Sequence, residues 1–241
     1  IQKLTASDSS TGDSFGYSVS IENNNCVIGA IGNNSNTGAA YIFTLQDGSW
    51  NQIQKLTASD SSTGDYFGTS VSVNGNNAIV GAFGNSSYTG AAYIFTLQDG
   101  SWNQIQKLTA HDSSTGYYFG CAVSIYGNNL VVGSKRDTLD GFAENVGSAY
   151  IFTLTNGSWM ETQKITPSDP SSNNYFGDSV SIDENNIIVG AYNYNDIGGA
   201  YIFELQNNNW NETSRISSNN FSSNDNFGKS GVDGNVNMSS Q

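Results

Sequence analysis

The charged side chains with the widest scope for chemistry lie in one stretch, residues 134–146, which reads SKRDTLDGFAENV. We take its charged members as candidate ligand-binding residues: Lys135, Arg136, Asp137, Asp140 and Glu144. Ammonium, guanidinium and carboxylate groups gathered in one loop can hold a polar ligand or a metal ion. An insertion tolerated at the surface has the same composition, so that alternative stays open.

Carboxylates also recur in four loops that read ASDSSTGD, ASDSSTGD, AHDSSTGY and PSDPSSNN. These weaker candidates for a metal site are Asp8, Asp13, Asp60, Asp65, Asp112 and Asp169. A ring of carboxylates suits calcium, and the sequence suggests no other cofactor. An aspartate followed by small polar residues also forms an Asx turn, in which its carboxylate accepts backbone N–H groups. We favour the turn.

Residue types for covalent or acid–base catalysis are scarce. His111 is the only histidine, and it replaces the Ser59 of the preceding copy of the same loop. Cys26 and Cys121 occupy different places in their repeats, so we expect two small apolar fillers rather than a disulfide. No GxSxG, HExxH or Cys/His cluster is present. The chain is therefore not expected to be an enzyme.

The charge balance limits the partners. The formal net charge is −13, from 21 acidic and 8 basic residues, whereas nucleic acid binding requires clustered Lys and Arg. No apolar run approaches the roughly 20 residues that cross a bilayer. In a secreted protein, sequons of the Asn-x-Ser/Thr type are glycosylation candidates. They begin at Asn33, Asn85, Asn156, Asn211, Asn220 and Asn237.

The elements that must position these residues belong to a tandem repeat. The dipeptide Phe-Gly returns every 51–57 residues, at Phe15, Phe67, Phe119, Phe176 and Phe227. Residues 38–58 and 90–110 are identical, reading GAAYIFTLQDGSWNQIQKLTA. A period of this size indicates a solenoid, a propeller or another array.

Each unit contains four short segments with strand character. They read FGYSVSI, CVIGA, GAAYIFTL and WNQIQKLTA in the first unit, and turns rich in Asn and Gly separate them. We predict an all-β fold, a β-propeller of four-stranded antiparallel blades in one domain, residues 1–241. Four blades are complete, at about 15–58, 67–110, 119–166 and 176–217. Residues 1–6 and 227–241 resemble a fourth and a first strand, so the termini are expected to form a partial fifth blade.

The aromatic residues recur at fixed places in the units. Trp50 and its counterparts open every fourth segment, and a Tyr-x-Phe pattern such as Tyr41 and Phe43 marks every third. Aromatic rows can be carbohydrate platforms, but a place held in every unit favours packing between blades. For the same reason we expect the Phe of each Phe-Gly pair to wedge between sheets, and the Gly to permit close approach.

This pattern of FGxSVSI, IVGA, GAAYIF and W…QKLTASD resembles the FG-GAP repeat, which is related to the propeller of integrin alpha subunits. The resemblance implies an extracellular or cell-surface propeller that is non-catalytic and serves adhesion or ligand binding. Two departures stand out. The Pro of the GAP is absent, and a tight turn such as Asn74-Gly75-Asn76-Asn77 replaces the calcium-binding DxDxDG loop of integrin-type blades. Calcium is therefore not expected at that turn.

Two functions follow from these expectations. The first is an extracellular glycoprotein that binds a protein or glycan ligand and mediates adhesion. The alternative is a structural subunit of a filament or surface layer, in which copies of the chain join through the incomplete terminal blade. The sequence does not identify the ligand.

Overall fold

In the computed structural model, which describes residues 1–139, 141, 144–217 and 226–229, the fold is all-β. Four antiparallel sheets of four strands each follow the chain as the blades of a β-propeller, as predicted. The first two blades are β1 (Phe15–Glu22), β2 (Asn25–Ala30), β3 (Ala39–Gln46) and β4 (Ser49–Leu56), then β5 (Ser70–Asn74), β6 (Asn77–Ala82), β7 (Ala91–Gln98) and β8 (Ser101–Leu108).

The other two blades repeat this order. They are β9 (Phe119–Tyr126), β10 (Asn129–Ser134), β11 (Ser148–Thr155) and β12 (Ser158–Ile165), then β13 (Phe176–Asp183), β14 (Asn186–Ala191), β15 (Gly199–Gln206) and β16 (Asn209–Ile216). Short helical turns α1 (Asn33–Asn36), α2 (Asn85–Tyr88) and η1 (Tyr194–Asp196) lie between the second and third strands. None of the helices among the described residues is long and apolar enough to cross a membrane.

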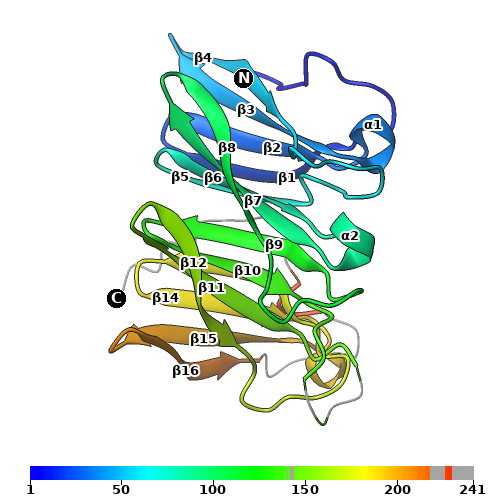
Figure 1. The fold of residues 1–241 in the computed structure, drawn as a ribbon, viewed down its shortest axis with the longest axis vertical. Helices are drawn as coiled ribbons and strands as arrows, with labels where there is room; N and C mark the ends of the chain where they lie inside the picture. The colour runs from blue at the N-terminus through cyan, green and yellow to red at the C-terminus, as the bar shows by residue number, and fades with distance from the viewer. Residues whose placement is uncertain (140, 142–143, 218–225, 230–241) are drawn as a thin grey trace.

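The blades stack in chain order from one end of the molecule to the other (Figure 1). At the first interface, Ile42 and Leu56 of one blade pack on Val71 and Trp102 of the next. Equivalent apolar residues form the second and third interfaces. The second and third strands of a blade are therefore buried at successive residues, because each sheet has two apolar faces and only its neighbours can remove both from water.

Each Phe-Gly pair joins two blades. Phe67 is fully buried and forms a parallel bridge with Gly38 of the preceding blade. Gly68 has φ +90°, and a Cβ atom there would lie 2.4 Å from the carbonyl oxygen of Ala39. The expected roles of wedge and close approach are thus confirmed, because only glycine fits this backbone.

The terminal segments extend the same pattern outward. Gln2 exchanges two hydrogen bonds with the backbone of Trp50, as Gln54 does with Trp102. Residues 1–6 therefore lie where the outer strand of a preceding blade would lie. Phe227 forms a bridge with Gly198, the position of a following inner strand. No strand pairing joins these two segments within the part of the chain that the structure describes, and residues 230–241 of the predicted fifth blade lie outside it.

We call one side of the stack the loop face. It carries the described parts of the loops of residues 31–37, 83–89, 134–139 and 192–197, together with the segments that precede the first four Phe-Gly pairs. In Figure 1, α1 and α2 mark this side at the right of the view. The loops that vary between repeats are therefore gathered on one side, above a scaffold that hardly varies.

Candidate functional site

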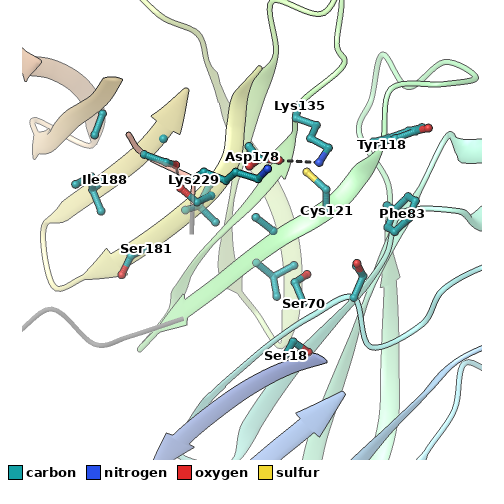
Figure 2. A pocket seen from close by; sticks show the side chains of 18 of the residues that line it. Ser18, Ser70, Phe83, Tyr118, Cys121, Lys135, Asp178, Ser181, Ile188 and Lys229 are labelled. Carbon is teal, nitrogen blue, oxygen red and sulfur yellow. Dashed lines mark hydrogen bonds and ion pairs between the residues drawn. The ribbon is translucent and has the colours of Figure 1, made fainter. Parts of the chain in front are cut away.

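The inner strands of all four blades line one cavity of about 850 Å³, which we call the axial cavity. Tyr17 of β1, Ser70 of β5 and Cys121 of β9 contribute to its wall. Lys135 donates to the carboxylate of Asp178 at 2.7 Å, as Figure 2 shows. Phe83 and Tyr118 lie on one side of the cavity, and Lys229 on the other (Figure 2). The volume matches the pockets that hold small ligands.

The titratable groups of the axial cavity favour binding over catalysis. Burial raises the pKa of the Cys121 thiol to about 11, so it stays protonated near neutral pH. Burial would lower the pKa of Lys135, but the acidic groups Cys121 and Asp178 outweigh it and raise that pKa to about 12. Among the described lining residues, Lys135 thus offers a fixed ammonium and Cys121 a neutral thiol.

Four of the recurring aspartates form one arrangement, which we call the loop anchor. The carboxylate of Asp8 accepts a hydrogen bond from Lys55 at 2.6 Å and another from the Tyr41 hydroxyl at 2.9 Å. The same contacts recur at the other three aspartates: Asp60 with Lys107 and Tyr93, Asp112 with Lys164 and Tyr150, and Asp169 with Arg215 and Tyr201. These carboxylates fasten each loop to the third and fourth strands of its blade.

The remaining two aspartates, Asp13 and Asp65, support turns. The sequence suggested the Asx turn for the aspartates that precede Ser-Ser-Thr-Gly, whose carboxylates accept from Lys and Tyr side chains: Asp8, Asp60 and Asp112. Asp13 accepts the backbone N–H of Ser10 at 2.8 Å and the side-chain amide of Asn33 at 3.1 Å, and Asp65 makes the same contacts in the next blade. Among the described residues, no group of three or more acidic, Cys or His side chains could hold a metal ion. Calcium binding therefore stays a prediction.

The four candidates of residues 134–146 that the structure describes have different surroundings. Lys135 faces the axial cavity, and the Arg136 guanidinium lies 4.4 Å from the centre of the Tyr118 ring. Asp137 is fully buried and accepts hydrogen bonds from Lys164 and Tyr150. Glu144 is exposed, while Asp140 lies outside the described residues. Ligand contact stays a prediction for Lys135, Arg136, Asp137 and Glu144. One oxygen of the Asp137 carboxylate is engaged by Lys164 and Tyr150, while the other has no hydrogen-bond partner among the described residues.

His111 has a local partner. Its Nδ1 lies 2.5 Å from the carboxylate of Glu161, and its backbone N–H donates to the same side chain. Ser59 and Gln104 make the corresponding backbone contact in the preceding repeat. The exchange of Ser-Gln for His-Glu keeps a hydrogen bond between neighbouring blades. The structure therefore gives the histidine a structural role.

The sequons differ in access. The side-chain nitrogens of Asn33 and Asn85 are buried and donate to Asp13 and Asp65, so glycan attachment would disrupt both turns. Asn156 and Asn211 are exposed and stay candidates for glycosylation. The remaining two sequons, at Asn220 and Asn237, lie outside the described residues.

The recurring aromatics pack between blades, as expected. Trp102, Trp159 and Trp210 are buried, and Trp50 is partly buried at the end of the stack. A second aromatic set was not anticipated. Tyr66, Phe83, Tyr88 and Tyr118 touch one another on the loop face, and we call them the aromatic shelf. The available signal was their absence from the first repeat, where Ser14, Ile31 and Asn36 replace the first three.

Comparison with known proteins agrees with the architecture. A family model described as FG-GAP repeat matches residues 1–43, 50–95, 102–152 and 159–203. These four matches cover more than half of the chain. No curated protein matches the sequence.

Proposed function

The chain belongs to the FG-GAP repeat family, and from that premise we propose that it is an extracellular, non-catalytic propeller that binds a ligand and mediates adhesion. FG-GAP repeats are typical of extracellular proteins, and their propellers are generally non-catalytic. The axial cavity carries the proposal, because a hollow of about 850 Å³ joins apolar walls with a few charged groups. The proposed ligand is a protein or a glycan.

Lys229 provides the test, since it is exposed, lines the axial cavity and lies 5.1 Å from the centre of the Tyr192 ring. The probes are immobilised lysozyme, immobilised serum albumin and a printed panel of neutral and acidic glycans. We expect the wild-type chain to bind at least one of them, and Lys229→Glu to weaken that binding about tenfold by reversing a charge beside the cavity.

The matched control is Lys3→Glu, which makes the same charge change at an exposed residue of the N-terminal segment, away from the cavity. It should bind like the wild type. A wild type that binds none of the probes would count against a ligand site in the cavity. An equal effect of both substitutions on binding would also count against it.

Assembly into a filament or surface layer is a second candidate, supported by the two end faces of the stack. Val19 and Ile21 of β1 are 38% and 60% exposed, whereas their counterparts Val71 and Val73 are 2% and 5% exposed. At the other end, Ile216 is 42% exposed, although its counterpart Leu56 is 2% exposed. The two faces are the halves of the interface that joins every pair of blades, so a second copy can dock head to tail.

This candidate predicts self-association that depends on both faces. Light scattering over a concentration series should show oligomers for the wild type and monomers for Ile21→Asp or Ile216→Asp. An equimolar mixture of the two variants keeps one intact face of each kind, so it should form a dimer and nothing larger. A wild type that stays monomeric at high concentration would contradict head-to-tail assembly.

A further inference from the structure

The first two repeats provide an internal comparison that points to a ligand site. Residues 1–52 and 53–104 differ at 11 positions. Three of these differences place Tyr66, Phe83 and Tyr88 where the first repeat has Ser14, Ile31 and Asn36. All three new rings are on the loop face and belong to the aromatic shelf. The scaffold did not require them, because the first repeat builds the same turn without them.

The rings of the aromatic shelf form a contiguous set. The rings of Tyr66 and Phe83 are stacked, with centroids 5.0 Å apart and planes within 3°. Tyr118 of the next blade lies 5.2 Å from both Phe83 and Tyr88. Tyr88 remains 39% exposed. Two blades thus present one partly exposed aromatic surface.

The backbone beneath the shelf is unfavourable for these residues. Tyr66, Tyr88 and Tyr118 have φ of 55°, 65° and 62°, a region in which bulky side chains are rare. The angle itself belongs to the repeat, since Ser14 and Asn36 have φ of 55° and 64° at the matching positions of the first repeat. The backbone therefore does not explain why tyrosine stands at these positions, and the choice of tyrosine needs another reason.

A polar cavity of about 480 Å³ adjoins the shelf. Tyr88 lines it together with Ser62, Thr63, Ser86 and Ser87, all of which are exposed, while the Asp60 carboxylate at its edge is held by Lys107 and Tyr93. The hydroxyl groups can donate and accept hydrogen bonds in several directions. An aromatic surface beside clustered hydroxyls suits a ligand with one apolar face and many hydroxyl groups.

We infer that the aromatic shelf and the adjoining polar cavity bind a neutral saccharide, which names a ligand class for the loop face and so rests on the proposed function. The C–H face of a sugar ring packs on aromatic rings, and its hydroxyls match the polar groups of the cavity. A net charge of −13 and the carboxylates of Asp60 and Asp65 disfavour phosphorylated or sulfated ligands.

The experiment replaces the shelf with the residues of the first repeat in one triple variant: Tyr66→Ser, Phe83→Ile and Tyr88→Asn. The probes are maltohexaose, cellohexaose and chitohexaose, with a hyaluronan hexasaccharide as an acidic comparison. Saturation-transfer NMR and calorimetry should show that the wild type binds at least one neutral probe and that the triple variant binds it about tenfold more weakly or worse. The hyaluronan probe should not bind.

The control is Tyr126→Asn, which removes a tyrosine that is 36% exposed at the end of β9 and introduces the residue found at the matching position, Asn74. It should leave saccharide affinity unchanged, and thermal unfolding should show that all variants fold. Equal affinity of the wild type and the triple variant would overturn the shelf site. A wild type that binds lysozyme or albumin but no saccharide would overturn only the ligand class, whereas one that binds no probe would overturn the proposed function as well.

Discussion

Replacing Lys164 with Met is expected to destabilise the protein by about 3–5 kcal/mol, because it leaves a buried carboxylate without its cation. Lys164 lies 2.6 Å from Asp112 and 2.7 Å from Asp137, and the Asp137 side chain is only 1% exposed. The Tyr150 hydroxyl is 2.7 Å from both carboxylates, but it has one proton and can donate to only one at a time. Denaturant unfolding of the variant measures the loss.

The first repeat supplies the matched control. Lys55 makes the same pair with Asp8, whose side chain is 45% exposed, and Asn33 occupies the place of Asp137. Lys55→Met should therefore lose only about 0–1 kcal/mol. Adding Asp137→Asn to Lys164→Met restores the asparagine of the first two repeats and should recover much of the stability. Equal losses for the two lysine substitutions would show that burial of Asp137 is not the cause.

The pH dependence of the wild type follows from the other carboxylate that Lys164 contacts. In the wild type, burial raises the pKa of Asp112, but the hydrogen bonds from Lys164 and Tyr150 outweigh it and lower that pKa. Its contribution is therefore present above a pH of about 3.8 and is lost as the pH falls further.

The strands could be predicted because the repeat fixes their pattern four times. Alternation in FGYSVSI and the Asn-rich turns predicted hairpins, and β1 to β4 follow these segments closely. The loop anchors were harder, since an Asx turn explains Asp8 as well as an ion pair does. No local pattern pairs Asp8 with Lys55, which is 47 residues away in sequence. In a single chain, a contact between distant residues is visible only where both partners change together between repeats, as at His111 and Glu161, which replace Ser59 and Gln104.

The aromatic shelf was hidden for a different reason. Tyr66, which precedes a Phe-Gly pair, is not part of an alternating apolar pattern. Backbone preferences do not predict a bulky residue at positive φ either. Phe83 follows a strand and resembles its apolar continuation. Their contact arises from the way the loops fold back above the blade, which is tertiary information. Residues that two nearly identical repeats share can be explained by the common fold. The few residues that differ between the repeats are therefore the better guide to function.

Replacing Trp102 with Ala should also destabilise the protein by about 3–5 kcal/mol, because it opens a cavity between the first two blades. Trp102 is 2% exposed and packs in the cluster that contains Ile42 and Leu56 of the preceding blade. Guanidinium unfolding should show the loss, and hydrogen exchange should show reduced protection in the first blade in particular. That pattern is expected because each blade of an array is stabilised mainly by its neighbours.

Two further substitutions make the test specific to packing. Trp102→Phe keeps a ring in place, and the indole N–H has no acceptor among the described protein atoms, so the loss should stay below about 1.5 kcal/mol. Trp50→Ala removes the same side chain at the open end of the stack, where it is only partly buried, and should lose less than half as much as Trp102→Ala. If all three tryptophan variants unfold like the wild type, these indoles do not hold the blades together, and their place in every repeat needs a surface function instead.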